Sequence, residues 1–147
     1  MAFSRQFSEL KVFETIDPAV DILPPAIVIP AGERWRIQGL TFSLNSSATA
    51  GNRVIWVGID RGSGTPYLQF ISSGYLQPAS RNTVYNFGPG AGYSSAVGIS
   101  NTLVSASLPV DFALESGWRI NINSEDLQAG DNFSKVILAY ELLNTGA

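Results

Sequence analysis

The chain of 147 residues contains neither cysteine nor histidine. Without cysteine it has no disulfide framework and no thiol nucleophile. Without histidine it lacks the commonest general base and the commonest metal ligand. Ser-His-Asp catalysis, zinc sites built from Cys and His, and histidine-dependent cupin chemistry are therefore excluded. A carboxylate pair, as in glycosidases, is the remaining catalytic alternative. The acidic residues are scattered along the chain, so we expect no enzymatic activity.

Charge is also scarce, because charged residues make up 14% of the chain against about 25% in an average soluble domain. The basic residues form no cluster and no tail: Arg5, Lys11, Arg34, Arg36, Arg53, Arg61, Arg81, Arg119 and Lys135. A nucleic-acid partner is not expected, since binding phosphates requires a concentrated positive surface. A weakly charged surface suits a subunit that is permanently packed against neighbours. The alternative is an ordinary β-protein surface rich in Ser and Asn.

Long hydrophobic segments are missing as well. No apolar run approaches the roughly 20 residues that a membrane-spanning helix needs, and the first nine residues lack the apolar core of a signal peptide. We therefore expect a protein made and folded in the cytoplasm, without a membrane partner.

Two loop segments raise the question of cofactors. The glycine-rich segment 88–92 lacks the lysine and the Ser/Thr of a P-loop. Near the C-terminus, four oxygen-bearing residues match no calcium-loop template: Glu125, Asp126, Asp131 and Asn132. We interpret the first segment as a flexible loop and the second as a solvated loop, and we expect neither cofactor nor metal.

Glycine and proline punctuate the chain at short intervals, and apolar residues mostly alternate between them. This pattern is typical of β-strands in a sandwich or barrel. The strand candidates are 10–16, 22–29 (at a sheet edge or beginning at Ala26, because of Pro24 and Pro25), 34–44, 53–60, 67–72, 83–87, 102–114, 118–123 and 134–142. We predict an all-β, single-domain antiparallel β-sandwich of jelly-roll type with eight or nine strands over residues 10–147, after an N-terminal arm at 1–9. A single-layer barrel is the alternative.

The segment 34–44 changes its phase. Its first two apolar residues share one face and the next three share the other: Trp35 and Ile37, then Leu40, Phe42 and Leu44. One extra residue in a strand reverses the alternation of its side chains. The pattern therefore predicts a β-bulge near Gly39 that turns all five toward the core.

The tripeptide Trp-Arg-Ile occurs twice, at 35–37 and 118–120, each time shortly after a turn glycine. In both copies the alternation places the tryptophan inward and the arginine outward. We expect Trp35 and Trp118 to pack in the core, and Arg36 and Arg119 to pair with acids on neighbouring strands.

Other aromatic and apolar residues are candidates for an interface. If Ile55, Val57 and Ile59 face the core, Val54 and Trp56 face outward, and an outward tryptophan is a typical interface anchor. The alternative is that both faces of that strand are covered within one subunit. The candidate interface residues are Phe3, Phe7, Val54, Trp56, Tyr75 and Tyr93. Phe3 and Phe7 fit either a short helix or an extended arm, and the two tyrosines either meet a partner or sugar, or pack locally.

The stretches Ile27–Ile37 and Leu114–Ile122 resemble the strand-turn-strand segments of small β-sandwich virion proteins of tailed bacteriophages. That group includes head decoration (cement) proteins. The resemblance extends over residues 10–142 as a style of sequence and not as a diagnostic motif, so it assigns no functional residue. It implies a virion location, a homo-oligomer with a trimer favoured, and the major capsid protein or another virion subunit as partner.

Two functional hypotheses follow. The first is a non-catalytic virion structural protein, most specifically a capsid decoration protein that stabilises the head through subunit–subunit contacts. The second is a carbohydrate-binding jelly-roll module or the receptor-binding tip of a phage tail fibre, which predicts exposed Trp or Tyr side chains on one face.

Overall fold

The computed structural model describes residues 9–15, 26–63, 68–71, 75–97 and 101–143. In these ranges the chain forms strands and turns without any helix. The strands are β1 (Glu9–Thr15), β2 (Ala26–Val28), β3 (Trp35–Asn45), β4 (Val54–Asp60), β5 (Leu68–Ile71), β6 (Asn82–Pro89), β7 (Ser94–Val97), β8 (Asn101–Leu108), β9 (Ala113–Leu114), β10 (Arg119–Glu125) and β11 (Asn132–Leu142).

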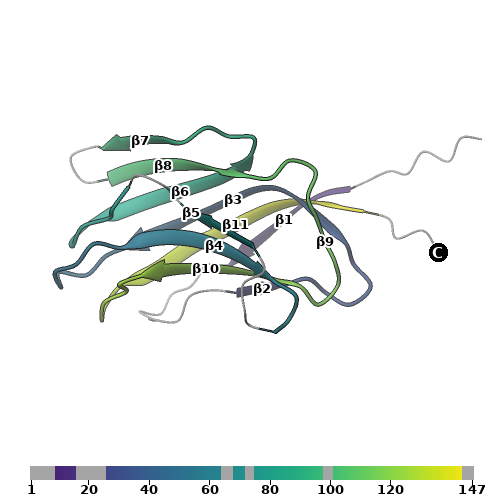
Figure 1. Cartoon of the computed structure of the whole chain (residues 1–147), viewed down its shortest axis with the longest axis horizontal. Coiled ribbons are helices and arrows are strands. Elements are labelled where there is room, and N and C mark those ends of the chain that lie inside the picture. Colours follow the sequence, from purple (N-terminus) through teal and green to yellow (C-terminus); the bar gives the residue numbers. More distant parts are fainter. Residues whose placement is uncertain (1–8, 16–25, 64–67, 72–74, 98–100, 144–147) are drawn as a thin grey trace, which may run out of the picture.

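The strands form two layers (Figure 1). The large sheet has the order β1-β11-β3-β6-β8-β7, and the short β9 also pairs with β3. The small sheet has the order β2-β10-β4-β5. The apolar side chains that alternate along both sheets meet between them and form one buried core, which is the arrangement of a β-sandwich.

The all-β sandwich that the sequence predicts is confirmed. Two details differ from the prediction. The described residues form eleven strands instead of eight or nine, and β6 pairs with β8 in parallel while the other strand pairs are antiparallel. An eight-stranded jelly roll divides its strands between two sheets. The division here is seven and four, so the jelly-roll type stays a prediction.

The predicted bulge in β3 is present. Ala139 of β11 lies opposite Gly39, and the next residue, Tyr140, lies opposite Ile37, so Gln38 is the extra residue. All five apolar side chains named for this strand are buried. The side chain of Gln38 points to solvent. One unpaired residue therefore allows an eleven-residue strand to supply the core along its whole length.

A second bulge lies in β11, which the sequence did not predict. The register shifts between Ser134 and Ile137, and Lys135 adopts a positive φ of 53°. The shift brings Phe133 to the same buried face as Val136. Phe133 then meets Phe42 at 6.0 Å between ring centroids.

The edges of the sheets also bear on the predictions. β2 begins at Ala26, directly after two prolines, and forms an edge of the small sheet, as expected. β7 was not predicted, because the strand candidates 83–87 and 102–114 leave 88–101 without a strand. Its Ser94–Val97 segment pairs with β8 and forms an edge of the large sheet. Residues 1–8 of the predicted arm lie outside the described residues, and Glu9 is the first residue of β1.

Candidate interaction surfaces

The outer face of the large sheet is the broadest surface of the sandwich and carries little charge. We call it the large-sheet face. Its register places side chains from six strands on one side: Leu10, Val12, Thr41, Ser43, Val84, Asn86, Ala96, Leu103, Ser105, Ile137 and Ala139. The charged side chains described there are few: Arg36, which contacts Glu141 at 2.8 Å and Asp111 at 3.8 Å, and Lys135 in the bulge. In the register of β1 a further acidic residue, Glu14, pairs with Ile137.

Four apolar side chains on the large-sheet face are exposed. Leu10 and Val12 on the edge strand β1 are 68% and 64% exposed, Leu103 on β8 is 46% exposed and Ile137 on β11 is 38% exposed. Between them lie small and amide side chains such as Thr41 and Asn86, which are joined by a 2.7 Å hydrogen bond. Exposed apolar side chains gathered on one face are a common mark of an interaction surface.

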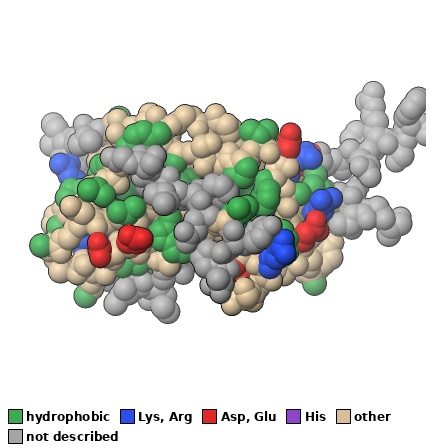
Figure 2. All heavy atoms as spheres, in the orientation of Figure 1, with side chains coloured by type: hydrophobic (Ala, Val, Ile, Leu, Met, Phe, Trp, Pro, Cys, Tyr) green, Lys and Arg blue, Asp and Glu red, His purple; other side chains and the backbone are tan. Residues whose placement is uncertain are grey.

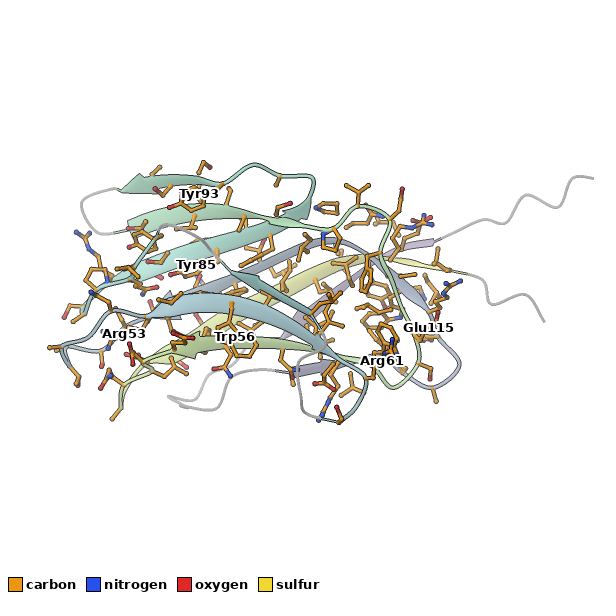
Figure 3. All side chains as sticks on the ribbon, viewed as in Figure 1. Arg53, Trp56, Arg61, Tyr85, Tyr93 and Glu115 are labelled. Carbon is orange, nitrogen blue, oxygen red and sulfur yellow. The ribbon has the colours of Figure 1, made fainter. Side chains whose placement is uncertain are left out.

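Trp56 lies on the opposite side of the molecule, on the outer face of the small sheet. We call this surface the small-sheet face. As the alternation predicts, Ile55, Val57 and Ile59 are buried, while Val54 and Trp56 are half-buried. Figure 3 shows Trp56 at the middle of the small sheet, far from Arg53 at one end and from Arg61 and Glu115 at the other. Figure 2 shows most charged side chains of the face in view toward the two ends.

Polar side chains lie beside Trp56 on β10, while on the other side Trp56 pairs with Ile71 of β5. Asn123 of β10 lies directly opposite Trp56, and Asn121 lies opposite Gly58. The carboxylate of Asp60, itself fully buried, accepts hydrogen bonds from Asn121 Nδ2 at 2.6 Å and Arg119 Nε at 3.1 Å. The small-sheet face therefore combines one aromatic ring with two amide groups, of which the buried Asp60 carboxylate holds that of Asn121 and the backbone N–H of Ser124 holds that of Asn123.

The other candidate interface residues are dispersed. Tyr75 packs against the core, with its ring 6.4 Å from that of Tyr85, which fits the local-packing alternative. Tyr93 is 44% exposed in the turn between β6 and β7. Phe3 and Phe7 lie outside the described residues. Of these residues, the two described tyrosines therefore do not share the small-sheet face with Trp56.

The two Trp-Arg-Ile copies differ in their tryptophans. Trp35 is buried, stacks on Tyr140 at 3.7 Å between ring centroids, and donates from Nε1 to Glu33 at 2.6 Å. Trp118 is only half-buried and packs against the rim of the core. The guanidinium of Arg61 lies 5.3 Å from the Trp118 ring centroid, which is within cation–π range. The predicted enclosure of Trp118 is thus incomplete, because this tryptophan precedes β10 at the end of the sandwich.

The two arginines of these copies pair with acids on neighbouring strands, as predicted. Arg36 on β3 contacts Glu141 on β11 at 2.8 Å, and Arg119 on β10 contacts Asp60 on β4 at 3.1 Å. Both contacts join residues that face outward on their sheets.

The expected solvated loop before β11 is wrong for Asp131, which is 1% exposed. Arg53, fully buried, donates from Nε and Nη2 to the two carboxylate oxygens, each at 2.8 Å. Burial alone raises the pKa of Asp131, but hydrogen bonds from Arg53 and from the backbone N–H groups of Gln128 and Ser47 outweigh it, so this pKa lies below its ordinary value. The carboxylate therefore joins the β3–β4 loop to its own β10–β11 loop at one end of the sandwich.

A neutral hydrogen-bond network lies beside this ion pair. The side-chain amide of Gln77 donates to the carbonyl oxygens of Leu44 at 2.8 Å and Arg81 at 3.0 Å, and it accepts from the hydroxyl of Tyr85 at 2.8 Å. Burial raises the pKa of Tyr85 above its usual range, so the phenol stays a donor. Because this polar end of the core is satisfied internally, we assign it to stability and not to ligand binding.

Two further properties concern metals and membranes. Among the residues with described side chains, no three or more acidic residues are arranged to hold a metal ion. Nor does the part of the chain that the structure describes contain a helix long and apolar enough to cross a membrane.

Fold and surfaces together define an all-β sandwich with two contrasting outer faces, one broad and weakly charged, the other centred on a tryptophan. The chain matches no protein-family model, and neither the curated proteins nor the solved structures give a significant match.

Proposed function

We propose that this chain is a non-catalytic structural subunit of a tailed-phage virion, a capsid decoration protein that stabilises the head through contacts with the major capsid protein. The observation that carries the proposal is the large-sheet face, where Leu10, Val12 and Leu103 are 46% to 68% exposed among few charged side chains. The resemblance of Ile27–Ile37 and Leu114–Ile122 to virion sandwich proteins supports the choice of partner.

The physical argument concerns desolvation. A decoration subunit has to exchange water for neighbouring protein over a broad area. Burying apolar surface contributes about 25 cal/mol per Å², whereas burying unpaired charges is strongly unfavourable. On the large-sheet face, Ser, Thr and Asn separate exposed Leu, Val and Ile side chains. Such a face gains free energy from apolar burial and largely avoids the cost of burying unpaired charges. Because the large-sheet face extends over six strands, a second copy of the chain can occupy it beside the capsid protein, and a trimer is favoured.

The proposal is tested by co-sedimentation with shells assembled from the major capsid protein encoded in the same genome. Val12 and Val110 are equally exposed, at 64%, but Val110 lies in the turn before β9 and is not among the strand residues whose register places them on the large-sheet face. We expect Val12→Glu to weaken attachment at least about tenfold, because a buried charge costs well over the 1.4 kcal/mol that a factor of ten requires. Val110→Glu should leave attachment unchanged.

A wild-type chain that does not bind these shells would overturn the proposal, and so would a genome without a capsid gene. If Val12→Glu and Val110→Glu weakened attachment equally, the chain would not attach through β1.

A further inference from the structure

We propose that the small-sheet face is a binding platform for a neutral, pyranose-based oligosaccharide, centred on Trp56. This site goes beyond the capsid attachment proposed above. The two outer faces of a sandwich point in opposite directions, so attachment through the large sheet leaves the small-sheet face directed away from the shell.

The first argument is the position of the Trp56 ring. A Cβ atom added at Gly58 would lie 2.6 Å from Cζ3 and 3.2 Å from Cε3 of Trp56. The ring therefore occupies the space above the residue two positions along its own strand. Side chains in strands normally stand roughly perpendicular to the sheet, whereas this indole lies along it. A ring in this orientation offers a flat apolar surface on which the C–H face of a pyranose can stack.

The second argument is the hydrogen-bonding capacity beside the ring. Oδ1 of Asn123 accepts from the backbone N–H of Ser124 at 2.7 Å, which leaves its amide nitrogen as a donor. Nδ2 of Asn121 donates to Asp60, which leaves its Oδ1 as an acceptor. A sugar hydroxyl donates and accepts at once. One free donor and one free acceptor next to an aromatic ring match that requirement.

The third argument explains why the ligand is neutral. Asp60 is fully buried and acts as a positioning residue, because it holds the side chains of Asn121 and Arg119 and also accepts from the backbone N–H of Gly62 at 2.6 Å. Its charge and that of Arg119 are paired with each other. The register places Glu125 on the same face, opposite Val54, and this exposed acidic side chain disfavours anionic ligands. The platform therefore offers an aromatic ring and fixed dipoles to a neutral ligand, and such preorganised polar groups confer specificity without ionic attraction.

The test begins with the fluorescently labelled full chain on an array of neutral and acidic glycans. The neutral oligosaccharides that bind are then titrated by isothermal calorimetry. We expect Trp56→Ala to weaken the affinity for them at least tenfold. Gly58→Ala should have a comparable effect, because the added methyl group displaces the ring. Asn123→Ala should weaken binding less, through loss of one hydrogen bond.

Trp118→Ala is the matched control, since it removes another half-buried tryptophan that precedes β10 and lies five positions before Asn123, and binding should persist. Thermal unfolding of each variant separates loss of the site from loss of the fold. An array without neutral ligands overturns the proposal, as do ligands whose affinity is unaffected by Trp56→Ala and Gly58→Ala. Because Trp56→Ala should leave capsid co-sedimentation intact and Val12→Glu should leave glycan binding intact, failure of either proposal is recognised separately.

Discussion

At the scale of single residues, burial distinguishes two ion pairs of identical length. The Arg53–Asp131 and Arg34–Glu115 contacts are both 2.8 Å long. The side chains of the first pair are 0% and 1% exposed, and those of the second are 46% and 50% exposed. Water screens the second pair and can solvate either partner alone. Water cannot solvate either buried partner of the first pair. The remaining donors of Arg53 already bind the carbonyl oxygens of Gly51 and Thr49.

Asp131→Asn should therefore be far more damaging than Glu115→Gln. Removing one partner of a buried pair leaves an uncompensated charge and costs about 3–5 kcal/mol, whereas an exposed pair contributes about 0–1 kcal/mol. The measurement is the free energy of unfolding from urea titrations at neutral pH. Similar losses for the two variants would show that water reaches Arg53 in the folded protein.

The sequence could not reveal this pair. Its members lie 78 residues apart, and each stands among polar residues that are typical of exposed loops. The opposite holds for Arg36 and Arg119, whose outward position follows from alternation with buried neighbours, so that acids on adjacent strands are their natural partners. Residue-level predictions succeeded where a strand period fixed the direction of the side chain and failed where a loop closed over a polar group.

At the scale of elements, the bulges decide which side chains reach the core. In β3 the phase change between Ile37 and Leu40 can be read from the apolar pattern alone. In β11 the apolar residues alternate regularly from Val136 onward, and Phe133 is out of phase with them. Only the positive φ of Lys135 brings Phe133 to the same face, and the sequence does not show it. A non-glycine residue adopts that conformation only where the surrounding structure imposes it.

Deleting Gln38 should abolish cooperative folding. Without the extra residue, either Trp35 and Ile37 or the three apolar residues after Gly39 would turn to solvent, and each buried side chain of this size contributes about 1.5–3 kcal/mol. Gln38→Ala keeps the register and, as a surface substitution, should change the free energy of unfolding by about 0.5 kcal/mol or less. Circular dichroism during thermal unfolding compares the two. A cooperative transition in the deletion variant would mean that the strand can restore its phase elsewhere.

No sequence pattern like the phase change in β3 indicated β7 or the parallel pairing of β6 with β8. Ser94–Val97 has four residues, of which two are serines, and its strand conformation comes from pairing with β8. The packing of the whole sandwich determines which strands become neighbours, so local sequence patterns do not predict strand pairing.

At the scale of the whole molecule, the sandwich has one interior and two unlike exteriors. Composition already indicated a weakly charged surface, and alternation placed Trp56 outward. The large-sheet face could not be predicted, because Leu10 and Val12 point outward only through the register of β1 with β11. Lys11 lies on the edge strand β1 and pairs with Tyr140 of β11, so it points inward. A charged residue that points inward on an edge strand disfavours pairing with a further strand. It therefore favours association through the face over association through the edge.

Association through the large-sheet face has a thermodynamic consequence. Binding that occurs only in the folded state raises stability by mass action, by about 2.7 kcal/mol at a hundred times the dissociation constant, and each kcal/mol raises the Tm of a domain of this size by about 2–4 °C. We expect the Tm of the wild-type chain to rise with protein concentration, to stay constant in Val12→Glu, and to rise normally in Val110→Glu. Differential scanning calorimetry across a hundredfold concentration range, with light scattering to count subunits, measures this. A wild-type Tm that does not depend on concentration would contradict a homo-oligomer built on this face, and capsid attachment would then have to proceed from the monomer.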